Sequence, residues 1–504
     1  MGILVYTLTP ILLLLLNVQC QSPHRETIVH LDLKGAPPRP SYFKQLLTIV
    51  GNLGANGVLI EWEDMFPYTG ALKRIRNGNA YTVDETLDIL QHAHSLGLSV
   101  IPLVQTVGHL EWILKTKEFA NLRENTSYPM VACIGNQETR GLILDSINQV
   151  MALHSKIQMP YIHIGADEVF QIGQCEANRK LLPVKYGNNT KRLMFDHLRT
   201  IATNITESFP KTKVLVWFDE LMYVEKSLIK EYGLDRLVVP VVWKYTTNLE
   251  KDLPTKMWQE LAASFPTVWG ASAFKGADGP NRYWNRMKGY VENNKQWYLQ
   301  AHKHAELFAD FHGFILTGWQ RYDHFASLCE LMPVSMASLA VNLKLIRNLA
   351  LTDADAEMIL RALKCPDDVT INQLISNEDN CHFAGYKVRD SIRDFILVKQ
   401  QYENASWVHN REAAYLQQSQ MRLNASNPFY VDAIGNSYRR SLARLDKIIE
   451  QLRSSMNDIF YNDVFVEFTT DYVSPFYNDL KERLASIKAI DVQRTYRARP
   501  WFRR

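Results

Sequence analysis

The sequence predicts an α/β protein, a (β/α)8 TIM barrel followed by a C-terminal helical region. From Thr27 to about Leu339, short apolar segments rich in β-branched residues alternate with longer amphipathic segments. Several of the short segments are apolar nearly throughout, which is typical of parallel strands buried on both faces. There are eight of them, and eight strands alternating with helices in roughly 300 residues match a (β/α)8 barrel in size and order.

The segments expected to be strands are Ile28–Leu33, Val58–Glu61, Ser99–Val104, Tyr161–Gly165, Val214–Trp217, Leu237–Trp243, Thr267–Ser272 and Gly313–Thr317. An open, doubly wound sheet is the alternative arrangement of the same elements. It would need a glycine-rich phosphate turn after the first strand, and this chain continues there as Asp32-Leu-Lys-Gly-Ala-Pro-Pro. The two prolines argue against a dinucleotide-binding turn and favour the barrel.

The intervening segments have the periodicity of amphipathic helices. Apolar side chains recur three or four residues apart in Val83–Leu96 and again in Leu142–Leu153, so each should bury one face. After about Asn348 the strand signals fade, and Ser437–Met456 is the clearest helix of the remaining chain. We therefore expect the barrel to occupy residues 25–349 and a helical region to occupy residues 350–504.

The N-terminal segment 1–21 is expected to be a signal peptide. It has a short leucine-dense core, and polar or small residues follow near Cys20 and Ser22. The core is too short for a comfortable membrane span, and no later segment has the character of one. Because no Lys or Arg precedes the core, an uncleaved anchor is the alternative.

Composition and charge exclude some partners. Hydrophobic residues make up 46% of the chain and charged residues 22%, an ordinary balance for a globular protein. The net charge of +3 is too near neutral for nucleic acid or an anionic membrane to be the main partner. The tail from Arg494 to Arg504 contains five arginines and is expected to be a solvated end.

Potential glycosylation sites and cysteines fit the secretory pathway, whether secreted, lysosomal or in the Golgi lumen. Sequons begin at Asn125, Asn188, Asn204, Asn404 and Asn424. Without Cys20, five cysteines remain, so at least one thiol is unpaired within a monomer. Cys365 and Cys381 form a plausible disulfide, and no cysteine and histidine cluster suggests a metal. A homodimer is left open.

Two adjacent carboxylates end the fourth predicted strand. The stretch from Tyr161 to Val169 reads Tyr-Ile-His-Ile-Gly-Ala-Asp-Glu-Val, and barrel enzymes carry catalytic groups at the C-terminal ends of strands. Mutual repulsion or burial raises the pKa of one carboxyl of such a pair. Asp167 and Glu168 are therefore candidates for an ionised and a proton-donating group, with His163 as an orienting neighbour. An exposed acidic pair or a pair of metal ligands is the alternative.

The motif around Asp167 and Glu168 resembles the signature of glycoside hydrolase family 20, the β-N-acetylhexosaminidases, and its hexosaminidase D-like branch most of all. Similar stretches span the whole predicted barrel. They are Val29–Pro38, Gly54–Tyr68, Val104–Glu111, His163–Val169, Ala271–Gly276 and Leu316–His324. The resemblance implies an exo-acting enzyme whose substrate is a glycan with a terminal β-linked GalNAc or GlcNAc, and which needs no cofactor.

The resemblance also implies substrate-assisted catalysis, in which the 2-acetamido oxygen of the sugar attacks its own anomeric carbon. Glu168 would be the general acid and then the base that activates water. Asp167 would hold the acetamide N–H and stabilise the oxazolinium-like intermediate. Because the nucleophile is tethered to the reacting sugar, the gain is one of proximity.

Further residues at predicted strand ends are expected to bind the sugar. Trp217, Trp243 and Trp319 end the fifth, sixth and eighth strands, and the resemblance implies that they wall the acetamide pocket. His109 resembles a family histidine near the acid, and Asp219 is expected to support the site. Core packing of the tryptophans and solvation of Asp219 are the alternatives.

Three positions depart from the family pattern and change the groups expected to recognise the sugar hydroxyls. Lys34 is nearest to the place of a family arginine, and lysine offers a point charge where arginine offers a fork. Phe274 stands where many members have a tyrosine, so Tyr245 is the expected replacement. Arg321 aligns near a family glutamate. Tolerance of both gluco and galacto configurations is therefore expected.

Two other functions remain as alternatives. A retaining glycosidase with a protein nucleophile would use Glu61 or Glu63 at the end of the second strand. A catalytically silent glycan-binding protein would keep the barrel without turnover, although the presence of both Asp167 and Glu168 argues against it.

Overall fold

The computed structural model describes residues 26–490, 495, 496 and 498 of the chain. The predicted signal peptide and most of the arginine-rich tail lie outside these residues. Eight strands form a closed barrel in the order β1-β10-β9-β8-β7-β6-β3-β2, which confirms the predicted fold class. The strands are β1 (Glu26–Asp32), β2 (Gly57–Glu61), β3 (Ser99–Leu103), β6 (Tyr161–His163), β7 (Lys213–Trp217), β8 (Val238–Trp243), β9 (Thr267–Lys275) and β10 (Asp310–Gly318).

Every neighbouring pair of barrel strands is parallel, including the pair β1 and β10 that closes the ring. All eight C-terminal strand ends therefore meet at one mouth. Inward-facing side chains of alternate positions, among them Ile28, Leu59 and Ile101, fill the barrel interior. The barrel is thus a packed core whose chemistry is confined to the mouth. A small antiparallel sheet, β4 (Arg123–Asn125) and β5 (Tyr128–Ala132), lies in the segment between β3 and β6.

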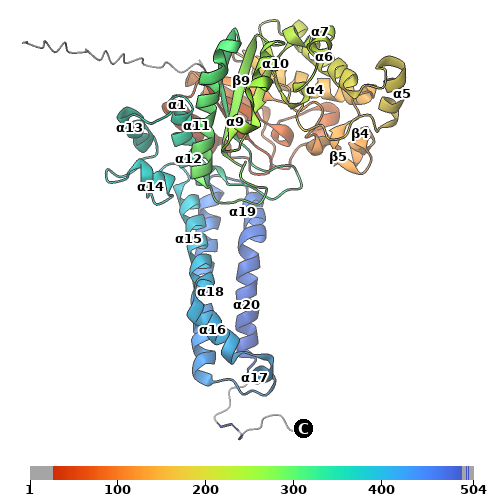
Figure 1. Ribbon diagram of the computed structural model, residues 1–504. Coiled ribbons are helices and arrows are strands. Elements are labelled where there is room, and N and C mark those ends of the chain that lie inside the picture. Colours follow the sequence, from red (N-terminus) through yellow and green to blue (C-terminus); the bar gives the residue numbers. More distant parts are fainter. Residues whose placement is uncertain (1–25, 491–494, 497, 499–504) are drawn as a thin grey trace, which may run out of the picture.

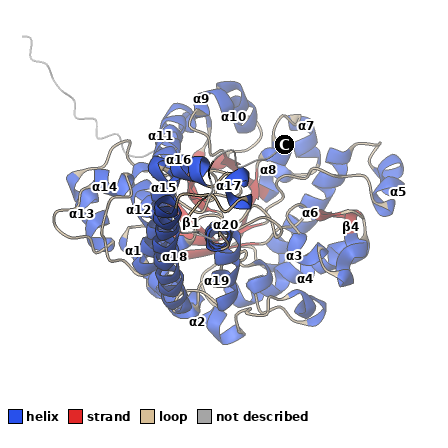
Figure 2. Cartoon of the chain, turned by 90° about the horizontal axis from the view of Figure 1, so that it is seen from below, coloured by secondary structure: helices blue, strands red, loops and turns tan. Residues whose placement is uncertain are grey.

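Amphipathic helices cover the outside of the barrel (Figures 1 and 2). They include α1 (Pro40–Asn52), α2 (Val83–Ser95), α4 (Gln137–His154), α6 (Thr190–Ser208), α10 (Thr255–Ala262), α11 (Met287–His304) and α12 (Met336–Leu345). Thr82 and Glu85 form a capping box at the start of α2, which satisfies two backbone donors of that helix end. The helices expected from periodicity in residues 83–96 and 142–153 correspond to α2 and to the later part of α4.

The C-terminal region divides by packing into two parts. Helices α13 (Asp353–Ala362) and α14 (Ile371–Ile375) contribute Ile359 and Leu374 to the same apolar core as the barrel helices. From residue 386 onward the chain forms a projecting bundle, which we call the stalk (residues 386–490; Figure 1). The apolar faces of α13 and α14 are therefore buried on the barrel, and the helices from residue 386 onward pack mainly on one another.

The stalk consists mainly of three long helices that lie side by side, α15 (Tyr386–Glu403), α18 (Pro428–Asn457) and α20 (Ser474–Lys488) (Figure 1). Helices α16 (Ser406–Tyr415) and α17 (Gln418–Arg422) lie toward its far end. The predicted helix 437–456 lies within α18, and its apolar side chains are buried between the neighbouring helices. Among the described residues, no helix is both long and apolar enough to cross a membrane.

The base of the stalk is attached to loops at the barrel mouth, near helix α19 (Asn462–Phe468). The Arg39 backbone N–H donates to the Ile459 carbonyl at 2.6 Å, and Tyr472 donates its hydroxyl to the Leu328 carbonyl at 2.5 Å. Arg39 follows β1 and Leu328 follows β10. The stalk therefore stands at the rim of the mouth, beside the ends of the first and last strands.

Two disulfides are present among the described residues. The predicted pair Cys365–Cys381 is confirmed, and a second disulfide joins Cys133 to Cys175. Cys329 is a buried free thiol, as the odd number of cysteines required. The second pair ties the loop that follows β6 to the segment after β5.

We expect Leu445→Ala to destabilise the stalk by about 2–5 kcal/mol, because this fully buried side chain of α18 would leave a cavity. The measurement is the shift of the chemical or thermal unfolding transition. Lys447→Ala, on the exposed face of the same helix, is the matched control and should stay within about 0.5 kcal/mol of the wild type. Equal effects of the two substitutions would contradict the buried interface.

Candidate active site

The turn after β6 carries the two adjacent carboxylates. Gly165, Ala166 and Glu168 have positive φ angles of 63°, 69° and 48°, a region that side chains larger than glycine seldom adopt. At Gly165 a Cβ atom would lie 1.9 Å from the Gln105 side-chain oxygen, so only glycine fits. Strained backbone of this kind is concentrated at functional sites, and here it sets the directions of Asp167 and Glu168.

His109 lies between the two carboxylates. Its Nε2 atom is 3.4 Å from Asp167 Oδ2 and 3.2 Å from Glu168 Oε2. Burial alone would lower the pKa of His109, but the Asp167 charge and the Glu168 hydrogen bond outweigh it and raise the pKa to about 10. The imidazolium therefore persists through neutral pH, and its charge offsets the repulsion between the adjacent carboxylates.

Asp167 and Glu168 occupy different environments. The Asp167 side chain is 9% exposed, and Gln105 donates from Nε2 to its Oδ1 at 3.0 Å. Burial raises the pKa of Asp167, although His109 and Gln105 oppose the rise. The Glu168 side chain is 40% exposed. Asp167 is thus held within the wall, while Glu168 is accessible to a molecule that enters the mouth.

Asp219 supports this turn from the end of β7. Its carboxylate accepts the Glu168 backbone N–H at 2.8 Å and the Trp243 indole N–H at 3.1 Å. Burial, together with the nearby Asp167, raises the pKa of Asp219 to about 7. Asp219 therefore joins the strained turn to one of the aromatic side chains of the mouth.

A cavity of about 150 Å³ opens at the mouth of the barrel, and polar groups converge there among aromatic side chains, as they do in small-molecule sites. Its lining residues are Lys34, Glu61, Gln105, His109, Asp167, Glu168, Trp217, Trp243, Tyr245, Gly276, Ala277, Trp319, Arg321 and Tyr322. Acidic groups form one part of the wall and aromatic rings another. Such a combination suits a polar ligand with flat apolar faces.

The aromatic wall is held in place by polar contacts and by ring packing. Trp319 donates its indole N–H to the Tyr245 hydroxyl at 3.1 Å, and Trp243 stacks on Tyr245 with ring centres 5.4 Å apart. The rings of Trp217 and Trp319 lie 6.1 Å apart. Phe274 is buried beneath Gly318 and does not line the cavity, so Tyr245 provides the hydroxyl on this side.

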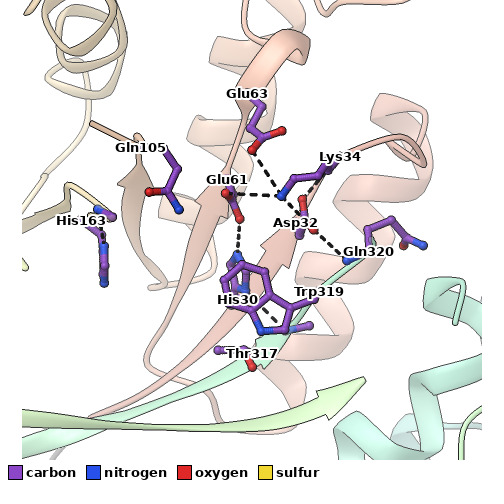
Figure 3. A network of polar contacts seen from close by, with 12 residues as sticks. His30, Asp32, Lys34, Glu61, Glu63, Gln105, His163, Thr317, Trp319 and Gln320 are labelled. Atoms are coloured by element: carbon purple, nitrogen blue, oxygen red, sulfur yellow. Dashed lines mark hydrogen bonds and ion pairs between the residues drawn. The ribbon is translucent and has the colours of Figure 1, made fainter. Parts of the chain in front are cut away.

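A buried network of charges (Figure 3) adjoins the cavity, and its members Lys34 and Glu61 line it. Lys34 Nζ lies 3.6 Å from Asp32 Oδ2, 3.7 Å from Glu61 Oε1 and 3.3 Å from Glu63 Oε1. Burial would lower the pKa of Lys34, but these three carboxylates raise it well above its usual value. His30 contacts Glu61 at 3.2 Å from the other side. Lys34 thus carries the charge that allows several carboxylates to be buried together.

The network continues into the loop after β10. Lys115 lies 2.9 Å from His324 Nδ1, and His324 Nε2 lies 2.6 Å from Glu63 Oε2. Burial lowers the pKa of His324 to about 3, so its ring is neutral and carries its proton on Nε2, which donates to Glu63. This contact fastens the β10 loop to the end of β2.

Of the residues expected to form the site, nine line the cavity. They are Lys34, His109, Asp167, Glu168, Trp217, Trp243, Tyr245, Trp319 and Arg321. The other two, His163 and Asp219, lie behind it. His163 Nδ1 accepts the Gly165 backbone N–H at 3.0 Å, its ring centre is 4.2 Å from that of Trp217, and burial lowers its pKa to about 3. His163 therefore orients the turn as a neutral acceptor and is out of reach of a ligand.

Sequence reasoning did not single out Gln105, which holds both Asp167 and the Ala166 backbone N–H. The available signal was its position directly after β3. Tyr322, Gly276 and Ala277 were missed because loop residues have no periodicity that reveals the direction of their side chains.

For metals, the one group of suitably spaced side chains among the described residues is Glu124, Cys133 and Cys175. The disulfide between these two cysteines leaves no thiolate to bind an ion.

Comparison with known proteins assigns the family. Residues 32–268 match the glycosyl hydrolase family 20 catalytic domain. Hexosaminidase D of Homo sapiens is 33% identical over 473 residues, which cover 93% of this chain and 96% of that protein. The chain belongs to glycosyl hydrolase family 20. Its enzyme class is therefore that of a glycoside hydrolase, a β-N-acetylhexosaminidase.

Two further proteins are similar to this chain. Hexosaminidase D of Bos taurus is 40% identical over 321 residues, which cover 63% of this chain and 90% of that protein. A β-N-acetylhexosaminidase of Bacteroides fragilis, known from a crystal structure, has 15% sequence identity and a TM-score of 0.49. That comparison covers 66% of this chain and 68% of the bacterial chain.

Glu111, which begins α3 (Glu111–Leu114), is fully buried, and neither of its carboxylate oxygens has a hydrogen-bond partner among the described residues. Burial raises its pKa to about 7. The folded protein thus keeps a proton that the unfolded chain releases, so folding stability falls as the pH rises from about 4.5 to about 7.

We expect Glu111→Gln to remove this part of the pH dependence, which amounts to about 1–3 kcal/mol. The measurement is the free energy of unfolding at about pH 5 and about pH 8. Glu118→Gln, at an exposed position nearby, is the control and should keep the wild-type slope. A Glu111→Gln protein with an unchanged slope would contradict the prediction.

Proposed function

We propose that this enzyme removes terminal β-linked GalNAc or GlcNAc from glycoconjugates, and that the acetamido oxygen of the substrate is its nucleophile. The observation that carries the proposal is the pair of adjacent carboxylates with unequal exposure, held on one strained turn at the mouth of an aromatic cavity. Membership of family 20 supports hexosaminidase chemistry. The two alternatives, a protein nucleophile and a silent binding protein, are outcomes of the tests below.

Glu168 is the proposed general acid. Its side chain is accessible, and it contacts the charged His109 at 3.2 Å. In the first step the acetamido oxygen bonds to C1, the glycosidic C1–O bond breaks, and the proton of Glu168 passes to the leaving oxygen. In the second step water attacks C1 and gives its proton to Glu168, and the acetamide re-forms. Two displacements at C1 retain the β configuration.

Asp167 is the proposed acceptor of the acetamide N–H. Gln105 occupies one of its oxygens and His109 approaches the other, so its carboxyl group is fixed in direction before substrate arrives. When the acetamide becomes an oxazolinium-like cation, a fixed carboxylate beside it stabilises the developing charge. The tryptophans of the cavity would enclose the methyl group and the sugar face.

The position of Glu61 argues against a protein nucleophile. Although it lines the cavity, its carboxylate is fully buried and contacts both Lys34 and His30. Burial alone would raise the pKa of Glu61, but Lys34 and the hydrogen bond with His30 hold it below its usual value. A carboxylate stabilised this strongly is a poor nucleophile. The two carboxylate oxygens of Glu63, the other candidate, contact Lys34 Nζ at 3.3 Å and His324 Nε2 at 2.6 Å.

The secretory pathway is the proposed location of the enzyme. Two disulfides support this placement, because disulfides persist in oxidising compartments. Potential glycosylation sites such as Asn125 and Asn404 are consistent with it. The natural glycan would then be part of a glycoprotein or glycolipid.

Glu168→Gln should lower kcat on nitrophenyl β-GalNAc and β-GlcNAc by about 100- to 10,000-fold, because the general acid is lost. Release of nitrophenol by purified protein is the measurement. Glu220→Gln is the control, since Glu220 does not line the cavity and its carboxylate lies 2.6 Å from Lys191 Nζ. Near wild-type turnover by Glu168→Gln would defeat the assignment. Sugar binding without turnover by the intact protein would favour the silent binding protein.

A thiazoline mimic of the oxazoline intermediate distinguishes the two hydrolytic mechanisms. It should inhibit competitively and bind at least about 100-fold more tightly than substrate, as transition-state and intermediate mimics do. Inhibition constants on the wild type and on Asp167→Asn are the measurement, and the substitution should weaken binding. Feeble inhibition of an active wild-type enzyme, together with covalent labelling of Glu61, would establish the protein-nucleophile mechanism instead.

A further inference from the structure

Arg321 connects the cavity to the stalk. It lies in the loop after β10 and lines the cavity, and its guanidinium donates three hydrogen bonds to groups of the protein. Nη2 donates to the Glu467 carboxylate at 2.8 Å, Nε donates to the Lys34 carbonyl at 3.3 Å, and Nη1 donates to the Ala326 carbonyl at 3.1 Å. Of these acceptors, the Glu467 carboxylate alone belongs to the stalk, where it lies on α19.

The turn after the first strand leaves room for this guanidinium. At Gly35, a Cβ atom would lie 2.0 Å from Arg321 Nη2 and 2.2 Å from Nε. Gly35 also has a φ angle of +82°, which favours glycine. The Arg321 side chain therefore lies directly over the β1 turn, and it occupies the space that a side chain at position 35 would fill.

The ion pair between Arg321 and Glu467 is partly shielded from water. The two side chains are 10% and 33% exposed, so screening is weaker than for a surface pair. A guanidinium has five N–H donors in a rigid fork. The three anchoring contacts hold the plane of the fork and leave at least one N–H donor free for a ligand.

We propose that Glu467 is a positioning residue for substrate binding: it holds Arg321 against the sugar hydroxyls, so that the stalk forms part of the binding apparatus of the barrel. This inference rests on the proposed function, since it assumes a sugar in the cavity. Arg321 belongs to the wall beside Lys34 and Tyr322. It is joined to the base of the stalk, where α19 also contacts Asn79 of the barrel through Asp463.

The physical reason is the entropy of a long side chain. A free arginine loses rotamer freedom when it is ordered by a ligand. With Glu467 in place, folding has already imposed that order. Contacts with remote hydroxyls persist in both the ground state and the transition state, so loss of the order should raise KM and leave kcat nearly unchanged.

The test compares Glu467→Ala with Asp463→Ala on the same helix. Each removes one carboxylate that joins α19 to the barrel, and alanine is compatible with a helix. For nitrophenyl β-GalNAc, KM should rise about 5- to 10-fold in Glu467→Ala. The kcat should stay within about 2-fold of the wild-type value, and the thermal unfolding transition should be unchanged. Asp463→Ala should match the wild type. Glu467→Gln, which keeps an acceptor without the charge, should lie between them.

Arg321→Ala and the double variant Arg321→Ala/Glu467→Ala complete a thermodynamic cycle. If Glu467 acts through Arg321, the double variant should have the same KM as Arg321→Ala. An unchanged KM in folded Glu467→Ala would overturn the inference. Additive losses, or an equal KM rise in Asp463→Ala, would also overturn it and would indicate general loosening of the stalk.

Binding of free N-acetylgalactosamine, measured by calorimetry on the same variants, separates this inference from the proposed function. If the wild type binds the sugar but releases no nitrophenol, the proposed function fails. The ratio of Kd values between Glu467→Ala and the wild type then still decides the role of Glu467. If the wild type neither binds the sugar nor turns over substrate, both proposals fall.

Discussion

The mouth of this barrel depends on the compensation of buried charge. Parallel closure brings the ends of eight strands together, and acidic side chains end several of them. Carboxylates without partners would raise one another's pKa values and destabilise the fold. Lys34 offsets part of the charge of Asp32, Glu61 and Glu63 from within, while burial still raises the pKa of Glu63. His109 offsets the charge of Asp167 and Glu168. These cations make it possible for a chemically active surface to be part of the folded core.

Charge compensation and backbone strain act together at the reactive turn. Positive φ angles at Ala166 and Glu168 are costly by themselves, by about 1–3 kcal/mol each. Gln105, His109 and Asp219 bind the turn from three directions, and these contacts offset the cost. The result is one enclosed carboxyl group and one accessible carboxyl group on adjacent residues. The same groups that stabilise the turn therefore establish the difference in exposure on which the proposed acid catalysis depends.

Apolar runs allowed the strands to be predicted, because strands buried on both faces have few other compositions. Site residues at strand ends were also predictable, since a parallel barrel collects them at one mouth. Which of these side chains would face the cavity could not be predicted from the sequence. His163 faces inward beneath the turn, and Asp219 binds backbone rather than facing the cavity. Likewise the packing of α13 and α14 on the barrel could not be read from the chain, where they were expected only as part of a helical region.

The sequence by itself determined the order of the elements, the family and the pair of adjacent carboxylates proposed to react, because hydrophobic periodicity and local motifs depend on neighbours along the chain. Tertiary structure decided which charges meet. Arg321 and Glu467 are 146 residues apart and neither lies in a repeating pattern, so only the docking of the stalk at the rim brings them together. Contacts between distant segments depend on packing geometry, which no local pattern encodes.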